Sequence, residues 1–349
     1  MYLVAPAGFP NWGDELIARA WLTHLADAWP AAEVILDCHT PGTTTLLHGG
    51  THPNLTVTDT LFRLAGDPGA ESRLTAGLAL LESATDIHLL GGGWVNDLWP
   101  HHAAIVEKAA EVARETGARL VATGQGLVPG AGIAPRLAGA WGEFELVDVR
   151  DAASCALLPP GVRASVSGDD AWLAEIGDGP RWARDRGFVV CVQSDLLDDA
   201  KGDPLDHVTR QLAAWGARGD EVVVLECIPG VDAAGLAAGA LTLGFEELWA
   251  EGLPARPGQR WLTTRYHPHL VAASRGASGV ALDAHVGGYY LAKHAAVGAV
   301  GSRWPVVVPG QLADAGPGMR ARDVEVARRA KWPLARSLYP VSRGAARRR

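Results

Sequence analysis

The pair Arg265 and His267 has the residue types and the spacing needed to hold and protonate an anionic substrate. Both residues follow an apolar run at 261–264 that predicts a strand, and the pattern at 266–275 predicts a helix. Arginine holds a carboxylate or a phosphate through two parallel hydrogen bonds, and histidine can donate a proton near neutral pH. The free N–H groups of a helix N-terminus also favour phosphate. The alternative is a surface arginine and an ordinary histidine at the start of a helix.

The first turn of the chain carries Asn11 and Asp14, whose side chains can hydrogen-bond the hydroxyls of a sugar. The turn joins an expected strand at 2–5 to an expected helix at 14–29, and α/β proteins bind ligands at such turns. It lacks the Gly-x-Gly-x-x-Gly spacing of a dinucleotide site. Asp14 is therefore either a base that acts on a hydroxyl or an ordinary helix cap.

Three consecutive glycines, Gly91, Gly92 and Gly93, follow an expected strand at 86–90. Because they have no Cβ atom, their backbone N–H groups can approach a ligand closely. Close packing against the next helix is the alternative. Asp97 comes soon afterwards and could line a sugar site.

Arg150 ends an expected strand at 146–150 and is a further candidate for binding an anion. Its neighbour Asp151 is well placed to cap the helix that we expect next. An ion pair between Arg150 and Asp151 or Asp148 is the structural alternative, and the sequence does not decide between the two roles.

Four segments, in this order along the chain, resemble the motifs of the polysaccharide pyruvyl transferase family. That family opens with an Asn-x-Gly-Asp-Glu turn, has a strand that ends in three glycines, continues with Val-x-Arg-Asp-x-x-Ser and has a late Arg-x-His element. Each motif alone has low specificity, but four in sequence order are fairly specific, and the resemblance spans residues 2–305. The corresponding segments here are 11–15, 91–93, 149–154 and 265–267.

The resemblance implies a transferase that uses phosphoenolpyruvate as its donor and two hydroxyls of one sugar as its acceptor. A cyclic ketal forms and phosphate leaves. The resemblance makes Arg265 and His267 the donor-binding and protonating residues, with Asp14 as a base. Phosphoenolpyruvate and a sugar are then the partners, and no cofactor and no metal are expected. Substrate binding is assigned to Asn11, Gly91, Gly92, Gly93, Asp97, Arg150 and Lys293.

The family also has a lysine after the strand that follows its Arg-x-His helix. We assign this place to Lys293, which comes 26 residues after His267 (293 − 267 = 26). His285 comes sooner after the expected strand at 279–282 and is the alternative. An exposed helical lysine with no role in the site is the third interpretation.

Two other functions stay open at this stage. A glycosyltransferase of the GT-B class would use a nucleotide-sugar donor, and Glu246 or Glu247 near Phe245 could contact its ribose and base. No clear donor motif is present, however. A non-catalytic glycan-binding relative would keep the fold without the activity.

The composition limits the partners and the location. A net charge of -8 and a sequence pI of about 5.8 argue against nucleic acid as a partner. No apolar run reaches the length of about eighteen residues that a membrane span needs, and the N-terminus lacks the basic segment of a signal peptide. The four cysteines form no Cys-x-x-Cys pair, so we expect buried, reduced thiols in the cytoplasm.

Short apolar runs alternate with longer helical patterns, which favours βαβ units and parallel sheets. A Gly/Pro-rich break near 176–180 divides the 349 residues into two domains. We expect an α/β protein with two Rossmann-like parallel-sheet domains, 1–176 and 187–330, that face a cleft, and the resemblance implies the same GT-B type of fold. Residues 331–349 are expected to form a basic, solvated tail, for which weak contact with an anionic membrane surface is a minor alternative.

Overall fold

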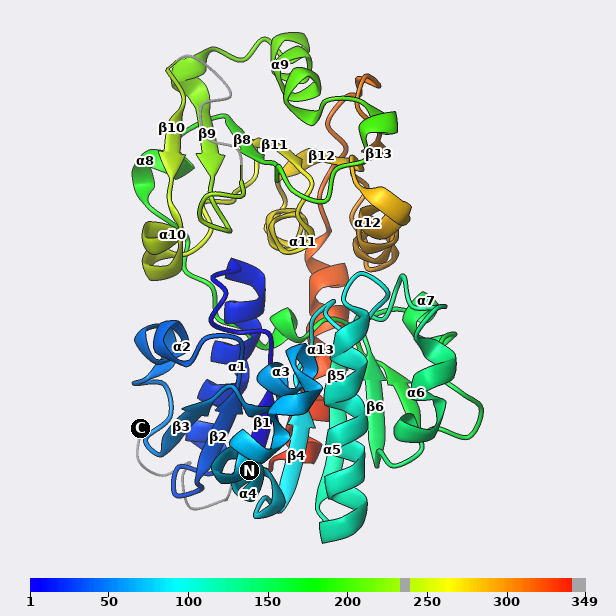
Figure 1. Ribbon diagram of the computed structural model, residues 1–349. Helices are drawn as coiled ribbons and strands as arrows, with labels where there is room; N and C mark the ends of the chain where they lie inside the picture. The colour runs from blue at the N-terminus through cyan, green and yellow to red at the C-terminus, as the bar shows by residue number, and fades with distance from the viewer. Residues whose placement is uncertain (233–238, 341–349) are drawn as a thin grey trace. The chain divides into compact units, whose positions relative to one another are not determined.

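The computed structural model describes residues 1–232 and 239–340, and the chain divides into two compact units. The first unit contains Met1–Phe9, Asp14–Ala174 and the C-terminal part from Arg328 onward, and the second contains Pro10–Gly13 and Glu175–Ala327. Each unit holds one parallel β-sheet surrounded by helices (Figure 1). The predicted pair of Rossmann-like parallel-sheet domains is therefore confirmed.

The first unit contains a seven-stranded sheet in the order β3-β2-β1-β4-β5-β6-β7. Its inner strands are almost fully buried, as expected for strands that are covered on both faces. The two edge strands, β3 and β7, were not predicted from the sequence, because their residues are mostly half-buried or exposed and lack a continuous apolar pattern. The strands are β1 (Tyr2–Val4), β2 (Val34–Asp37), β3 (Leu55–Thr58), β4 (Asp86–Leu89), β5 (Arg119–Gln125), β6 (Leu146–Val149) and β7 (Ala164–Val166).

The helices of this part of the chain connect and cover the strands. The amphipathic helix α5 buries Ile105 and Val106 against Leu89 of β4 and its neighbours in one core. The helices are α1 (Trp12–Ala28), α2 (Pro41–His48), α3 (Thr60–Gly66), α4 (Thr75–Glu82), α5 (Ala103–Thr116), α6 (Ala134–Trp141) and α7 (Ala152–Cys155), with short 3₁₀ helices η1 (Pro68–Arg73), η2 (Pro100–His102) and η3 (Asp170–Leu173).

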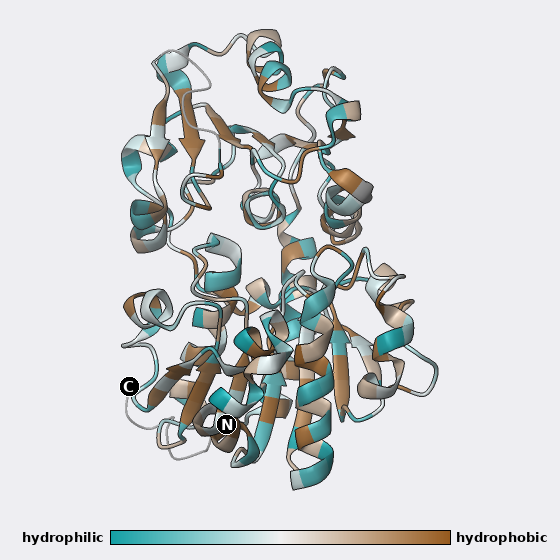
Figure 2. Ribbon diagram, viewed as in Figure 1, coloured by the Kyte–Doolittle hydropathy of each residue, from teal (hydrophilic) through white to brown (hydrophobic). Residues whose placement is uncertain are grey.

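The second unit contains a six-stranded sheet in the order β10-β9-β8-β11-β12-β13. The strands of both sheets are predominantly hydrophobic in Figure 2, and in this unit Val190, Leu262 and Val280 from three adjacent strands share one core. The strands are β8 (Phe188–Cys191), β9 (Val222–Leu225), β10 (Leu241–Leu243), β11 (Arg260–Thr263), β12 (Ser278–Leu282) and β13 (Val306–Val307). The helices are α8 (Arg181–Arg184), α9 (Pro204–Ala214), α10 (Phe245–Glu251), α11 (Tyr266–Ser274) and α12 (Tyr289–Ala299), with η4 (Asp199–Lys201), η5 (Gly219–Glu221) and η6 (Val286–Gly288).

The end of the chain differs from the expected tail. Residues 331–338 belong to helix α13 (Ala321–Leu338), which begins in the second unit and ends in the first. Its many arginines suggested a solvated tail, but Lys331, Ala335 and Leu338 are buried. The expected tail is therefore wrong for residues 331–338, and residues 341–349 lie outside the described part of the chain. No helix among the described residues is long and apolar enough to cross a membrane.

Candidate active site

Arg265 lies between β11 and α11, at the carboxyl edge of the second sheet, and only 8% of its side chain is exposed. Its Nε donates to Asp232 Oδ1 at 2.8 Å, and its Nη2 forms an ion pair with the same oxygen at 2.7 Å but has no hydrogen-bond partner among the described residues. The other oxygen of Asp232 accepts the backbone N–H groups of Cys227 and Ile228, at 2.7 and 2.8 Å. The guanidinium is thereby fixed to the loop after β9. Because arginine has five N–H donors, this arrangement keeps others for a ligand.

Helix α12 brings aromatic and basic side chains to the same edge. The hydroxyl of Tyr290 hydrogen-bonds Arg265. The Lys293 ammonium lies 3.8 Å from the ring centroid of Tyr289 and 4.9 Å from that of Tyr290, and it also hydrogen-bonds the Tyr289 hydroxyl. The ring centroid of His285 is 4.3 Å from that of Tyr290. Lys293 and His285 therefore both lie next to the tyrosine that contacts Arg265.

His285 is fully buried, and neither of its ring nitrogens has a hydrogen-bond partner among the residues that the structure describes. Burial, together with the positive charge of Arg265 and of Lys293, lowers the pKa of His285 to about 3. Buried polar groups are normally hydrogen-bonded. Because the buried imidazole of His285 lacks such a bond and lies close to the cations Arg265 and Lys293, it indicates a site for a bound anion or hydroxyl group. The structure does not choose between Lys293 and His285 for the expected lysine role.

His267 lies in the first turn of α11, half-buried, directly against Gly13 of the opening turn. A Cβ atom on Gly13 would come within 1.8 Å of His267 Nδ1, so a side chain there would displace the imidazole. Trp12 donates its backbone N–H to the Cys227 carbonyl at 2.9 Å, and Asn11 Oδ1 accepts from the Gly13 N–H at 3.3 Å. The turn that carries Asn11 and the segment that carries His267 therefore meet in the second unit.

Asp14 belongs to the first unit and lies beside the glycine run, because its Oδ1 would be 3.5 Å from a Cβ atom on Gly92. The N–H groups of Gly91 and Gly92 have partners within that unit. Gly91 donates to Asp170 Oδ2 at 3.0 Å, and Gly92 donates to the Gly124 carbonyl at 3.4 Å. Gly91 and Gly92 are therefore closely packed within the first unit, and their role in ligand binding stays a prediction.

Asp97 and Arg150 also have structural partners in the first unit. The two oxygens of Asp97 accept the backbone N–H groups of Gly132 and Ile133, at 3.0 and 2.9 Å, and so fix the loop before α6. Arg150 is buried and donates to Asp151 Oδ2 at 3.3 Å. The ion pair that the sequence left open for Arg150 is therefore present.

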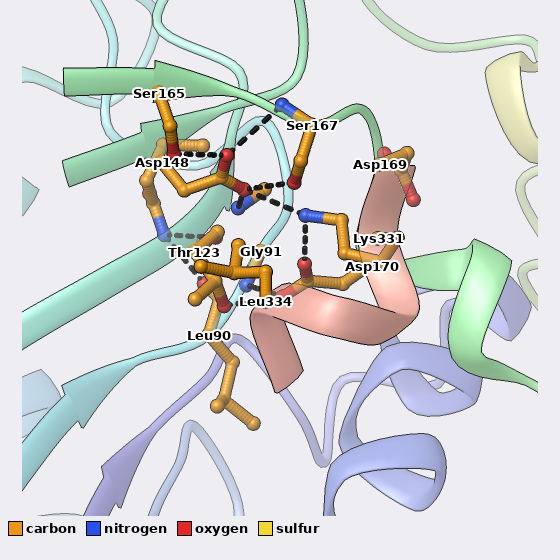
Figure 3. Close-up of polar contacts among 12 residues, drawn as sticks. Leu90, Gly91, Thr123, Asp148, Ser165, Ser167, Asp169, Asp170, Lys331 and Leu334 are labelled. Atoms are coloured by element: carbon orange, nitrogen blue, oxygen red, sulfur yellow. Dashed lines mark hydrogen bonds and ion pairs between the residues drawn. The ribbon is translucent and has the colours of Figure 1, made fainter. Parts of the chain in front are cut away.

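A buried polar network that the sequence analysis missed lies at the carboxyl edge of the first sheet (Figure 3). Lys331 Nζ is 2.7 Å from Asp148 Oδ2 and 2.7 Å from Asp170 Oδ1, and all three side chains have 0% exposure. The two carboxylates also accept hydrogen bonds from Trp21, Gly91, Thr123, Gly124, Ser165 and Ser167. Gly91 belongs to one of the motif segments and Asp148 directly precedes another, so residues in and next to the motifs help to hold α13.

The two parallel-sheet units give this protein the fold of the GT-B glycosyltransferases and epimerases. The structure is similar to HepE of Anabaena, solved in complex with UDP and glucose, with 14% sequence identity, a TM-score of 0.50 and coverage of 97% of this chain and 95% of that one. It is also similar to a putative UDP-N-acetylglucosamine 2-epimerase from Listeria monocytogenes, with 10% identity, a TM-score of 0.52 and coverage of 99% and 93%. At these identities the similarity shows the fold alone.

A family model described as polysaccharide pyruvyl transferase matches residues 11–206, which is more than half of the chain. The protein therefore belongs to the polysaccharide pyruvyl transferase family, and it is a transferase. The match includes Asn11, Asp14 and Arg150 but ends before Arg265 and His267, so the roles of those two residues stay predictions. No curated protein matches the sequence significantly.

Proposed function

We propose that this protein transfers the enolpyruvyl group of phosphoenolpyruvate to a sugar of a polysaccharide or glycoconjugate and forms a ketal. The observation that carries the proposal is the buried Arg265 at the start of α11, with His267 two residues later. His285 lies nearby and has no hydrogen-bond partner among the described residues. Phosphoenolpyruvate carries a carboxylate and a phosphate, and a protein with a net charge of -8 must bind it through such a local cluster. Membership of the family supports the reaction class.

In the proposed reaction, Arg265 binds the donor carboxylate or phosphate with N–H groups that Asp232 does not use. His267 gives a proton to the methylene carbon of the enol, which makes the neighbouring carbon oxocarbenium-like. One sugar hydroxyl adds to that carbon and loses its proton. Phosphate then leaves with the electrons of its C–O bond, and the second hydroxyl adds and loses its proton, which closes the ketal. One of the released protons is taken up by phosphate and the other restores His267.

The remaining candidate site residues differ in how well their contacts support a role in substrate binding. We propose Asn11 as a ligand of the sugar hydroxyls, Asp14 as their base, and Lys293 as a further donor-binding cation. Asp97, Arg150 and the glycines at 91–93 stay candidates for substrate binding, although Gly91 and Asp97 already have partners within the first unit. A cytoplasmic location is part of the proposal, because all four cysteines are free thiols, as is usual in a reducing compartment.

A nucleotide-sugar glycosyltransferase is the second candidate. HepE, of similar fold, was solved with UDP and glucose. Of the carboxylates considered for a ribose contact, Glu247 already accepts a hydrogen bond from Trp182 Nε1 at 2.8 Å. This contact weakens the second candidate, which otherwise rests on the fold.

Phosphate release tests the proposal directly. Purified protein is incubated with phosphoenolpyruvate and a panel of sugars and glycans, and the products are examined for the mass of a ketal. Release that needs both substrates and falls in Arg265→Lys supports the pyruvyl transferase. Release of UDP from UDP-glucose without phosphate release from phosphoenolpyruvate would favour the glycosyltransferase, and glycan binding without either reaction would favour a non-catalytic relative.

A further inference from the structure

Two thiols and a carboxylate lie together next to Arg265 in the second unit. Cys191 ends β8, Cys227 follows the adjacent strand β9, and Asp232 lies in the loop after it. The two Sγ atoms are 3.5 Å apart, and both sulfurs and a carboxylate oxygen of Asp232 all lie within 4.8 Å of one another. All three residues are buried. The proposed transfer reaction uses neither thiol.

The distance between the sulfurs suits a shared metal ion. Two thiolates bound to one tetrahedral zinc ion at about 2.3 Å lie about 3.8 Å apart, close to the 3.5 Å between Cys191 and Cys227. A disulfide would need the sulfurs at about 2.05 Å, and all four cysteines are free. The pair therefore needs little movement to bind a metal ion and much more to form a disulfide.

The charges of the surrounding groups also fit a divalent ion. A divalent cation with two thiolates, the Asp232 carboxylate and the Arg265 guanidinium gives a group with no net formal charge. Such neutrality matters because uncompensated charge in a protein interior is costly. The backbone N–H groups of Cys227 and Ile228 already orient the carboxylate, as partners outside the metal's own ligands commonly do.

We propose that Cys191, Cys227 and Asp232 form a binding site for a thiophilic divalent cation such as Zn²⁺, with the fourth position taken by water. No metal was expected from the sequence, because the two cysteines are 36 residues apart and form no motif. The pairing of adjacent parallel strands brings them together. Since Asp232 also holds Arg265, the bound ion competes for the carboxylate that positions the guanidinium. This last consequence, weaker donor binding when the ion is present, rests on the proposed function.

Cobalt is the probe for the site itself, because Co²⁺ bound to thiolate absorbs in the near ultraviolet. Metal-free protein is titrated with Co²⁺ in the presence of a non-thiol reductant, and Zn²⁺ is then added. We expect one Co²⁺ per chain, a sulfur-to-cobalt band, and loss of that band when Zn²⁺ displaces the cobalt. Cys191→Ser and Cys227→Ser should each abolish the band and weaken binding by about tenfold or more, at least the loss that follows removal of a supporting partner.

Cys155→Ser is the matched control, because Cys155 is half-buried in the first unit. It should bind Co²⁺ as the wild type does. Alkylation of the wild-type protein, mapped by mass spectrometry, does not depend on whether any variant folds. Zn²⁺ should protect Cys191 and Cys227 from alkylation and leave Cys155 unprotected. The absence of a sulfur-to-cobalt band in the wild type, or alkylation of Cys191 and Cys227 that occurs in metal-free protein and is not slowed by Zn²⁺, would overturn the site.

The link to Arg265 has a separate readout. Calorimetric binding of phosphoenolpyruvate is measured in metal-free and Zn²⁺-loaded protein, and we expect weaker binding in the loaded form. If the cobalt band is present but phosphoenolpyruvate does not bind even to metal-free protein, the metal site stands and the proposed function fails. If the donor binds equally in both forms, the competition for Asp232 is wrong.

Discussion

At the scale of single residues, the proposed donor recognition depends on the N–H groups that Arg265 does not donate to Asp232. Arg265→Ala removes them all and leaves a buried carboxylate without its cation, whereas Arg265→Lys keeps the charge but loses the planar fork. We expect phosphoenolpyruvate binding to weaken by about 2–5 kcal/mol in the alanine variant and to be only partly restored in the lysine variant.

Calorimetry, with thermal unfolding to check folding, measures this difference. Arg260→Lys is the matched control, because Arg260 is exposed at the opposite end of the same strand. Equal donor affinity in wild type and both Arg265 variants would exclude Arg265 as the anchor.

His267 should affect the chemical step more than donor binding. As the proposed general acid, it contributes a proton, and loss of such a group commonly lowers turnover by about 10²–10⁴-fold. His267→Gln should therefore lower kcat to that extent while the donor affinity changes little. His101→Gln, at an exposed histidine of the first unit, is the control. A variant with normal kcat and poor donor affinity would make His267 a binding residue instead.

The lowered pKa of His285 predicts that the folded protein loses stability in acid. Its pKa of about 3 in the folded protein lies below the usual 6.5. Between these pH values the imidazole is therefore protonated in the unfolded chain but not in the folded one. Stability therefore falls as pH drops from about 6.5 toward 3, by up to about 1.4 kcal/mol per pH unit for one group. His285→Gln should flatten this dependence by about one proton, as measured by unfolding at pH 4 to 7. An unchanged dependence, equal to that of His101→Gln, would contradict the assignment.

At the scale of elements, the Lys331 network decides how α13 is held. Lys331→Met leaves the carboxylates of Asp148 and Asp170 buried without their cation, and breaking a buried pair in this way costs about 3–5 kcal/mol. The exposed Arg328 on the same helix gives the control, Arg328→Met, for which we expect little change. Denaturant unfolding followed by circular dichroism measures both.

A second substitution separates charge from packing in this network. Adding Asp170→Asn to Lys331→Met removes one of the two buried carboxylate charges that have lost their cation, and should restore part of the stability. If Lys331→Met is no less stable than Arg328→Met, the ion pairs do not hold the helix.

The same elements show what the sequence could and could not predict. Central strands such as β4 and β11 are short apolar runs and were expected, whereas β3 and β7 lie at sheet edges and carry no such pattern. The position of Arg265 after a strand could be predicted from the local sequence. Its pairing with Asp232 could not, because Asp232 lies in an irregular loop whose position depends on the pairing of β8, β9 and β11. Lys331 was placed in a tail because its partners are in distant segments of the sequence.

At the scale of the whole molecule, the chain order makes the second unit an insertion into the first. The chain leaves the first unit after Ala174 and returns at Arg328, so the segment from Arg328 to the end of α13 completes a unit that began at Met1. This order predicts that the stability of the first unit depends on residues that follow the second unit in sequence.

Two shortened chains test this dependence. A chain that ends at Pro340 keeps Lys331 and all of α13, and we expect its unfolding midpoint to match that of the full chain. A chain that ends at Ala327 keeps every residue of the second unit and removes Lys331, which leaves Asp148 and Asp170 buried without a cation. Because that loss costs about 3–5 kcal/mol and the packing of Ala335, Leu338 and Tyr339 is lost as well, the first unit should unfold at lower temperature or fail to fold. Limited proteolysis should then cut within the first unit and spare the second, and equal resistance of both units in the shorter chain would show that the first unit does not need its C-terminal segment.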